Sequence, residues 1–476
     1  MSSDERFDIC VIGGGSGGLS VAAGAAQMGA KVVMVERARM GGDCLNTGCI
    51  PSKALIAAAH RAHAMRDSEK FGIASVKPEV RFENVCRHVH GVIAAIAPHD
   101  SVKRFSGLGV KVISAEARFL QPDLLAAGDT LIRARRFVIA TGSRPVIPPI
   151  DGLSDCDYLT NETIFELQER PDHLIVMGGG PIGVELSQAF RRLGAQVTLI
   201  ERAQILPRDE PEAVAIVRAA LVEDGVVLIE NAEIVAVERR DSGTVATVRT
   251  ADGETRNLNG SRILVAAGRK PDVDSLNLSA AGVEHGPKGI TVDARLRTTN
   301  RKIFAIGDVS GGPQFTHIAG YHAGIVIRNA LFWLPAKVDY RALPWVTYTD
   351  PELAHVGLTE AQARAEGHSA STLIEPLRTN DRAQTERETE GLAKIVIGSR
   401  GRILGATIVG PHAGELIGLW GLAIGQRMKL SAIAGMIAPY PTLSEISKKV
   451  AGQYYTRTLY SDRVKALVRA IQWLMP

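Results

Sequence analysis

The chain has 476 residues, of which 45% are hydrophobic and 22% charged, a composition typical of a folded globular protein with about three domains. Its formal net charge of +4 is too small for this length to indicate a nucleic acid partner. Five cysteines are too few for a secreted fold held by disulfides, and no uncharged apolar run is long enough to cross a bilayer. Because Met1–Arg6 is polar and shows no targeting segment, we expect a cytoplasmic enzyme.

The start of the chain predicts a nucleotide-binding unit. A β run at Phe7–Ile12 leads into a glycine-rich loop, a helical stretch follows at Leu19–Met28, and a second β run, Lys31–Glu36, ends in an acid. This order is typical of the strand, loop and helix that bind a dinucleotide, with the pyrophosphate at the helix N-terminus. The residues assigned to this site are Gly13, Gly15, Gly18 and Glu36.

The same unit recurs in the middle of the chain. The β run His173–Met177 precedes a second glycine-rich loop, and the β run Val197–Glu201 again ends in an acid, 18 residues after the third glycine as in the first unit. One such glycine pattern arises by chance about 0.5 times in a chain this rich in glycine, so the repeated layout carries the prediction. The second site contains Gly178, Gly180, Gly183 and Glu201.

A further repeat supports this duplication. Phe137–Pro145 and Ile263–Pro271 are each a β run that ends in small residues and glycine, followed by a basic residue and proline. We expect Thr141, Gly142 and Gly268, in the turns of these segments, to lie beside the bound dinucleotides.

Two dinucleotide sites in one chain indicate electron transfer between a nicotinamide and a flavin. The acid of each unit suits a free ribose hydroxyl, so Glu36 fits FAD, and Glu201 favours NADH because it would repel a 2′-phosphate. Arg202 and Arg208 are close to Glu201 in the sequence and could accept that phosphate, which leaves NADPH as the alternative.

Two cysteines five residues apart follow the first unit, within Gly41–Lys53. A close cysteine pair in an intracellular protein is more often catalytic or metal-binding than structural. A metal site would need four ligands, and no second Cys or His pair is nearby. We therefore predict that Cys44 and Cys49 form a redox-active disulfide, with a metal site and an inert pair as the alternatives.

These segments resemble the pyridine nucleotide–disulfide oxidoreductases, which include lipoamide dehydrogenase, glutathione reductase and mercuric reductase. The resemblance rests on Gly41–Lys53, which is highly specific, and extends over essentially the whole chain through Ile303–Asp308, Phe315–Ala319 and Val346–Gly357. It implies an α/β fold of two Rossmann-like dinucleotide-binding domains, for FAD and NAD(P), and a carboxy-terminal α+β domain that forms a homodimer. The further FAD contacts that it implies are Gly42, Lys53, Asp308, His317 and Ala319.

The domains are predicted to be interleaved. The FAD-binding domain would comprise residues 1–150 and 276–340, the NAD(P)-binding domain residues 151–275, and the dimerisation domain residues 341–476. The chain must return to the first domain because Asp308 has to reach the FAD. Within the last domain, Gly401–Gly410 is predicted to form a strand, a turn and a second strand.

The resemblance also implies an order of electron transfer. NADH would reduce the flavin, Cys49 would lie against the flavin ring as a thiolate, and Cys44, farther out, would react with the acceptor. Either task needs a thiolate, so the site should lower a thiol pKa. Lys53 and Glu185 match an ion pair of the family near the flavin, where the lysine charge would stabilise the reduced ring.

One position departs from the disulfide-reducing members of the family. Those end in His-Pro-Thr-x-x-Glu, supplied across the dimer interface; here Tyr440 replaces the histidine, and Glu445 is retained. Because the pKa of Tyr is about 10, against about 6.5 for His, Tyr is a poor proton shuttle. Mercuric reductases also carry this tyrosine, but the chain lacks their terminal Cys-Cys pair. We expect a metal ion or another non-dithiol acceptor; a disulfide reductase such as lipoamide dehydrogenase and a non-catalytic flavoprotein are the alternatives.

The carboxy-terminal stretch predicts an amphipathic helix. Its apolar positions are Val464, Leu467, Val468, Ile471, Leu474 and Met475, and its basic positions are Arg463, Lys465 and Arg469. One interpretation is a helix packed on its own domain; the other is a basic helix that contacts a membrane surface peripherally. The cysteines outside the motifs, predicted to be structural, are Cys10, Cys86 and Cys156.

Overall fold

The structure is a computed structural model that describes residues 6–241 and 243–475, apart from the side chain of Arg457. The polar segment at Met1–Arg6, in which no targeting signal was predicted, lies outside the described residues except for its last one. The chain divides into two compact units. Unit 1 contains Met1–Met65, Lys77–Arg202 and Ile229–Val338, and unit 2 contains Arg66–Val76, Ala203–Leu228 and Asp339–Pro476. The domain boundaries expected from the sequence stay a prediction.

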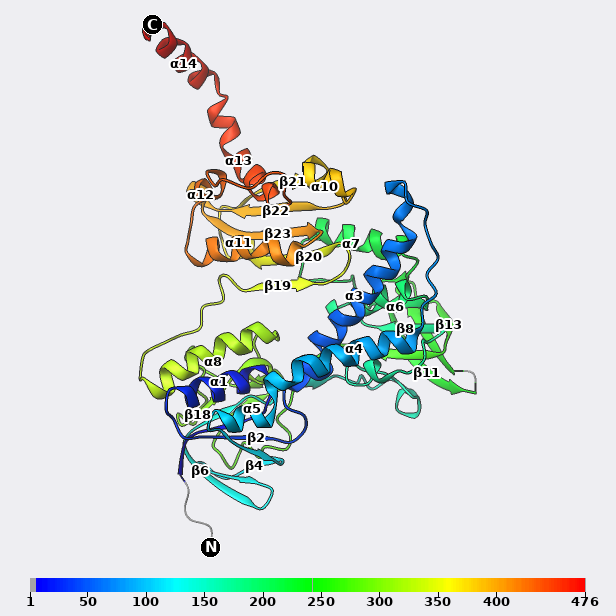
Figure 1. The fold of residues 1–476 in the computed structure, drawn as a ribbon, viewed down its shortest axis with the longest axis vertical. Helices are drawn as coiled ribbons and strands as arrows, with labels where there is room; N and C mark the ends of the chain where they lie inside the picture. Colours follow the sequence, from blue (N-terminus) through cyan, green and yellow to red (C-terminus); the bar gives the residue numbers. More distant parts are fainter. Residues whose placement is uncertain (1–5, 242, 476) are drawn as a thin grey trace. The chain divides into compact units, whose positions relative to one another are not determined.

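A seven-stranded sheet in unit 1 has the strand order β3-β2-β1-β6-β5-β4, with β18 also paired to β6 (Figure 1). Its strands are β1 (Arg6–Ile12), β2 (Val32–Glu36), β3 (Lys111–Ser114), β4 (Ala117–Gln121), β5 (Leu124–Ala127), β6 (Thr130–Ile139) and β18 (Ile303–Ala305). The strands β3, β2, β1, β6 and β18 are parallel, whereas β4 and β5 form an antiparallel extension. Ile303 lies opposite Phe137, so the chain returns to its first sheet just before Asp308.

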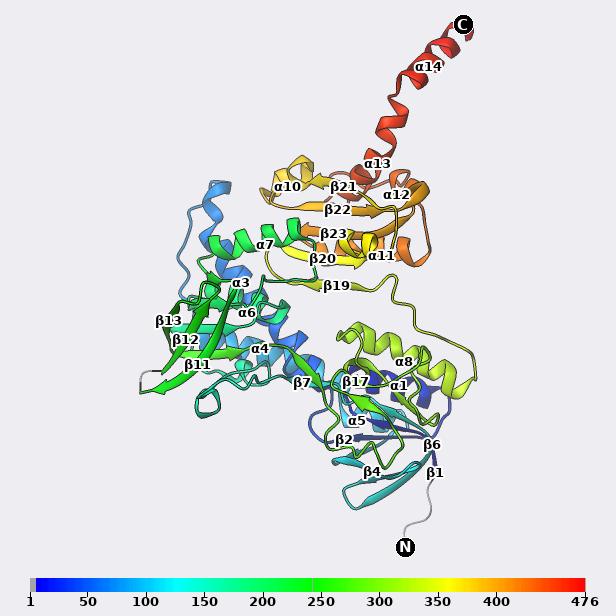
Figure 2. The same ribbon diagram turned by 180° about the vertical axis from the view of Figure 1, so that it is seen from behind.

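Two helices cover this sheet side by side, α1 (Ser16–Gln27) and α8 (Thr316–Leu331), as Figures 1 and 2 show. They approach closely because α1 consists largely of glycine and alanine: a Cβ added to Gly24 would lie 2.6 Å from Cδ1 of Ile327 in α8. The structure thus confirms the first predicted strand–loop–helix unit. Another helix, α5, spans Val102–Gly107 and immediately precedes β3.

The second predicted unit is also confirmed. The parallel strands β9 (Gln196–Ile200), β8 (His173–Met177) and β14 (Arg262–Val265) lie next to one another, and α6 (Pro181–Arg192) connects β8 to β9. A separate antiparallel sheet follows in the chain, with the order β11-β12-β13. Its strands are β11 (Ala232–Arg240), β12 (Gly243–Thr250) and β13 (Thr255–Gly260). Strand β10 (Val227–Ile229) is not part of this sheet.

The two repeated segments that follow β6 and β14 pair with each other. Strand β7 (Ser143–Pro145) runs antiparallel to β15 (Arg269–Pro271), with Arg144 opposite Lys270 (Figure 2 labels β7). A second short pair joins β16 (His285–Gly286) to β17 (Gly289–Ile290).

Unit 2 contains a five-stranded antiparallel sheet with the order β19-β20-β23-β22-β21. Its strands are β19 (Pro344–Thr347), β20 (Glu352–Gly357), β21 (Ser371–Pro376), β22 (Leu392–Ile397) and β23 (Ile403–Gly410). Helices α11 (Ala413–Gly425) and α13 (Glu445–Leu459) pack on it, and Trp420 of α11 is fully buried in the core. The other helices of the unit are α7 (Pro211–Glu223), α9 (Glu360–Ala365), α10 (Asp381–Glu386), α12 (Leu430–Ala434) and α14 (Asp462–Leu474).

Two expectations for unit 2 are wrong. Gly401–Gly410 contains no internal turn, since β23 is one continuous strand from residue 403. Within this strand glycine is required at residue 405, because a Cβ there would lie 1.9 Å from the carbonyl oxygen of Leu358. The interpretation of the last helix as packed on its own domain also fails, because none of the described residues of α14 is buried. No helix in the described part of the chain is long and apolar enough to span a membrane.

The close approach at Gly405 predicts a large effect of a single methyl group. We expect Gly405→Ala to lower the free energy of unfolding by about 2 kcal/mol or more, since two backbone segments would have to separate. Gly418→Ala is the matched control: Gly418 lies in α11 with nothing within 4 Å of its Cβ position. There alanine should change stability by less than about 1 kcal/mol, in the stabilising direction. Urea unfolding midpoints of the two variants compare them; equal midpoints contradict the prediction.

Candidate active site

The two glycine-rich loops repeat each other in backbone geometry as well as in sequence. Their first glycines, Gly13 and Gly178, have φ of +108° and +110°. A Cβ on the third glycine, Gly18 or Gly183, would lie 1.9 Å from the carbonyl oxygen of the first. Each loop leads into a 12-residue helix whose N-cap is the middle glycine. A glycine turn that ends at a helix N-terminus is the arrangement that binds pyrophosphate.

The acids at the ends of the second strands are tied back to these loops. Glu36 accepts hydrogen bonds from the backbone N–H groups of Gly14 and Ala38, the latter at 2.7 Å. Glu201 accepts one from the N–H of Gly179 at 2.6 Å. In both units the bonded amide belongs to the residue after the first glycine. The carboxylates therefore hold the loops in place, a role additional to the ribose contact predicted for them.

The motif cysteines lie on consecutive helices, α2 (Gly42–Asn46) and α3 (Cys49–Arg66), and both are thiols in the structure. The Cys44 thiol is hydrogen-bonded to Cys49, whose Sγ also lies 3.4 Å from Oγ1 of Thr316. The hydrogen bond from Cys44 lowers the pKa of Cys49 to about 6, and the same interaction raises the pKa of Cys44. These interactions favour a thiolate on Cys49 over one on Cys44.

The predicted ion pair beside the cysteines is present. Lys53, one turn along α3 from Cys49, places Nζ 2.8 Å from Oε2 of Glu185 in α6. The Glu185 side chain is only 6% exposed, and its ion pair with Lys53 offsets part of the cost of burying a carboxylate. The Lys53 ammonium also helps to lower the pKa of the Cys49 thiol.

A set of polar contacts that the sequence did not predict connects the cysteine loop to Asp308. Asp43 accepts a hydrogen bond from Nδ2 of Asn161 at 2.9 Å and pairs with Arg269 at 2.8 Å. Nε of Arg269 donates to Oγ of Ser143 at 2.8 Å, and this hydroxyl donates to Asp308 at 2.5 Å. Burial raises the pKa of the Asp308 carboxyl. The only sequence signal for Arg269 is the basic residue in the repeated segment.

The other predicted cofactor residues of unit 1 are placed as follows. The Thr141 hydroxyl donates to the carbonyl of Asp272 at 2.7 Å, and the His317 ring stacks on Phe315. Arg202 is exposed and forms an ion pair with Glu233 at 3.4 Å.

Several of the predicted cofactor residues are glycine or alanine, and the space around them differs. A Cβ on Gly42 would lie 2.7 Å from Cα of Gly15, so the cysteine segment packs directly on the first glycine loop. Gly142 and Gly268 have positive φ and nothing within 4 Å of their Cβ positions, which leaves their backbone accessible. Ala319 packs against the glycines at residues 17 and 307.

In unit 2, Tyr440 lies in the segment that precedes α13, and Glu445 begins that helix. The Tyr440 hydroxyl donates to Oδ2 of Asp381 at 3.1 Å, and this carboxylate raises the Tyr440 pKa. Glu445 is the first residue of α13, and its carboxylate lies 3.5 Å from the backbone N–H of Thr442. Because the phenol is less acidic than in water, phenolate is even less available as a base at neutral pH.

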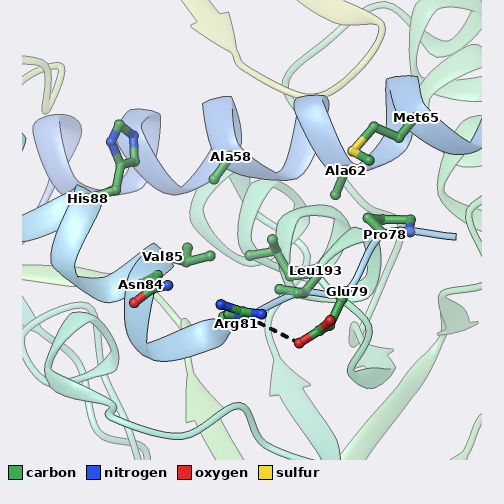
Figure 3. A pocket seen from close by; sticks show the side chains of 11 residues that line it. Ala58, Ala62, Met65, Pro78, Glu79, Arg81, Asn84, Val85, His88 and Leu193 are labelled. Atoms are coloured by element: carbon green, nitrogen blue, oxygen red, sulfur yellow. Dashed lines mark hydrogen bonds and ion pairs between the residues drawn. The ribbon is translucent and has the colours of Figure 1, made fainter. Parts of the chain in front are cut away.

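A hollow of about 350 Å³ lies beside the later turns of α3 (Figure 3). Figure 3 shows Ala58, Ala62 and Met65 of α3 opposite Asn84, Val85 and His88 of α4 (Phe82–Ile96), with Leu193 between them and Glu79 paired to Arg81. None of the residues that line this hollow belongs to the predicted site, so we do not assign it to the redox centre.

Comparison with known families agrees with this geometry. The family model described as pyridine nucleotide-disulphide oxidoreductase matches residues 7–323, and the model of its dimerisation domain matches residues 343–451. The chain belongs to this family. Members of the family bind FAD and NAD(P)H. The two family models and the similarity to a solved disulfide reductase confirm the fold class predicted from the sequence.

Relatives of this oxidoreductase carry two kinds of name. A mercuric reductase of Lysinibacillus sphaericus is 37% identical over 455 residues, which cover 95% of this chain and 83% of the relative. A dihydrolipoyl dehydrogenase of Geobacillus stearothermophilus is 38% identical over 449 residues, covering 93% and 94%. Among solved structures, the Cu(II) complex of the HOCl-induced flavoprotein disulfide reductase RclA from Escherichia coli has a TM-score of 0.85 at 27% identity, covering 94% of this chain and 99% of that one.

The residues of this oxidoreductase fit both cofactors of the family. Each glycine loop leaves no room for side chains at its first and third glycines, and the Cβ position of Gly180 has nothing within 4 Å. The accessible backbone at Gly142 and Gly268 adds polar groups beside the loops. When bound, FAD supplies hydride acceptance from the nicotinamide and electron transfer to a disulfide.

The thiol assignment predicts a pH dependence for the reduced enzyme. Cys49 should be alkylated by iodoacetamide with a midpoint near pH 6, because the thiolate is the nucleophile and exists above that pKa. Cys44→Ala removes the hydrogen-bond donor and should move the midpoint upward by at least about one pH unit. Peptide mass spectrometry after timed alkylation measures both; a wild-type midpoint above pH 8 would refute the assignment.

Proposed function

We propose that the chain is an NADH-dependent flavoprotein oxidoreductase. In this proposal electrons pass through FAD to a redox-active Cys44–Cys49 pair and then to a metal ion or another non-dithiol acceptor. Glu201 supports NADH, with NADPH as the alternative because of the basic Arg202 beside it. The observation that carries the choice of acceptor is the Tyr440 hydroxyl, which donates to Asp381 and so cannot take up a proton at neutral pH.

The thiol pair has the asymmetry that such a centre needs. The low pKa of Cys49 supports its assignment as the inner thiolate, and the Lys53 charge, fixed by Glu185, favours negative charge beside it. Cys44 keeps its proton and is assigned to the acceptor side. When the pair delivers two electrons to the acceptor, the Sγ–Sγ bond forms and the proton of Cys44 is released. Reduction then breaks that bond and returns the proton.

Exchange with a dithiol substrate would need an additional proton acceptor. A dithiol must lose a proton to attack a disulfide, and a histidine near neutral pKa performs this step efficiently. A tyrosine whose pKa is raised by a carboxylate does not. A soft metal ion binds to thiolates and itself promotes loss of the Cys44 proton to solvent, so its reduction depends less on a base supplied by the protein.

Names of the relatives support both acceptor classes. Mercuric reductases and the Cu(II) complex of a disulfide reductase point to metal ions. The dihydrolipoyl dehydrogenase at 38% identity supports the alternative, a dihydrolipoamide dehydrogenase or another disulfide reductase. A non-catalytic flavoprotein is the remaining alternative, and two cysteines in the redox motif with unequal pKa values argue against it.

The dimerisation domain supports a homodimer. In that arrangement Tyr440 and Glu445 would serve the cysteine pair of the second copy, as the family resemblance implies. We place the enzyme in the cytoplasm on the sequence argument alone.

Restoring the base tests the role of residue 440. Tyr440→His should raise turnover with dihydrolipoamide at least about tenfold, because a general base of suitable pKa is returned to the site. Tyr440→Phe, which removes the hydroxyl and adds no base, is the matched control and should give no gain. If wild-type turnover is already fast and histidine adds nothing, the chain acts as an ordinary lipoamide dehydrogenase.

A steady-state comparison of acceptors tests the proposed reaction. Hg(II), Cu(II), quinone, lipoamide and glutathione disulfide would each be supplied with NADH and with NADPH. We expect the highest kcat/KM with a metal ion and NADH. Reduction with NADH should produce a long-wavelength absorption band, because the Cys49 thiolate would lie against the flavin ring. Cys49→Ser should lose both this band and metal-dependent NADH oxidation. Wild-type NADH oxidation with none of the acceptors would support the non-catalytic alternative.

A further inference from the structure

The carboxy-terminal helix α14 leaves large apolar side chains in solvent. Leu467 is 58% exposed, Ile471 40% and Leu474 71%, and none of the described residues of the helix is buried. Figures 1 and 2 draw α14 in red, beyond the end of α13. Single exposed apolar residues are normal on protein surfaces, but a contiguous set marks an interaction surface.

Apart from Trp473, which lies on the opposite side and is 86% exposed, the large apolar residues of α14 lie on one side of the helix. At 3.6 residues per turn they occupy an arc of about a third of the circumference. This arc, the apolar face, consists of Val464, Leu467, Val468, Ile471 and Leu474, with Met475 at its end. Arg463 and Lys465 border the arc on either side, and Arg469 lies on the opposite face. The one acid, Asp462, is in the first turn.

The helix is a separate element of its unit. Its first turn is capped locally by Ser461, whose hydroxyl accepts a hydrogen bond from the backbone N–H of Val464. The match to the family's dimerisation domain ends at residue 451, before α14 begins. The apolar face is therefore outside the segment that characterises dimerisation in this family.

We propose that α14 binds an anionic lipid surface. Three basic residues against one acid require a negatively charged partner, and the apolar face requires an apolar one; a bilayer with anionic head groups supplies both. At 1.5 Å per residue the 13-residue helix is about 20 Å long, against a hydrocarbon thickness of roughly 30 Å, so it lies along the surface and does not cross it.

The border positions of Arg463 and Lys465 suit this orientation. Their long aliphatic stems can follow the apolar face while the charged ends reach phosphate groups. Near an anionic bilayer each basic residue raises partitioning by roughly fivefold, an effect that salt screens. A second copy of this chain is the other candidate to cover the face. The chain's own net charge of +4 makes it a less complementary partner for a basic helix.

Vesicle flotation of the full-length FAD-loaded enzyme tests this inference, which goes beyond the proposed function and does not depend on the acceptor. The wild type should float with vesicles of phosphatidylglycerol and phosphatidylcholine and not with phosphatidylcholine alone. Leu467→Ser combined with Ile471→Ser should lower the bound fraction at least about tenfold. Ala466→Ser combined with Ala470→Ser adds the same two serines outside the apolar face and should change it less than about twofold.

The charges are tested separately. Changing Arg463, Lys465 and Arg469 to Gln leaves the apolar face intact and should remove the preference for anionic vesicles, as 0.5 M salt should for the wild type. All variants should keep their FAD content and NADH oxidation. The inference is overturned if the wild type does not float with anionic vesicles, or if the Leu467/Ile471 variant floats as well as the wild type. Dissociation of the dimer by that variant, measured by light scattering without any lipid binding, would assign the face to a second copy.

Discussion

The nucleotide-binding halves depend on one steric constraint, the distance between a helix and the strand before it. A Cβ on Gly18 or Gly183 would lie 1.9 Å from a carbonyl oxygen, so only glycine lets each helix start where it does. That start sets the position of the helix N-terminus and of the loop that the Glu36 and Glu201 carboxylates hold. The same constraint extends to the redox centre, because the segment at Gly42 packs on the first loop.

The electrostatics of the centre follow from this packing. Cys49 begins a helix, and Lys53 one turn later meets a buried carboxylate from the helix of the second nucleotide unit. A positive charge is thus fixed near one thiol, and the hydrogen bond from Cys44 supplies the rest of the asymmetry. Two identical side chains five residues apart acquire different pKa values because they occupy different places relative to one lysine and to each other.

The sequence was sufficient for the parts of the site that lie within one motif. Glycine spacing predicted both loops, and the Gly41–Lys53 segment predicted the cysteines and the lysine. It was not sufficient where a contact joins distant segments: Asp43, Arg269 and Ser143 lie in three separate motifs, and no one motif shows that their side chains meet. The turn predicted within Gly401–Gly410 was wrong for a related reason, since a glycine required by a neighbouring backbone segment looks the same in the sequence as one required by a turn. The exposure of α14 depends on what packs against it, which periodicity alone does not give.

The pairing of β7 with β15 has a consequence for how the two halves meet. The segments are repeats, and they run antiparallel with Arg144 opposite its counterpart Lys270. Equivalent residues are therefore related by a local two-fold axis, the relation found in an isologous interface between identical subunits. Inside a single chain that symmetry need not be exact. It is broken where Ser143 and its counterpart Arg269 differ, and their hydrogen bond links Asp308 to the cysteine loop. The repeated segments thus pair symmetrically in β7 and β15, and the difference between Ser143 and Arg269 makes this pairing part of the asymmetric redox site.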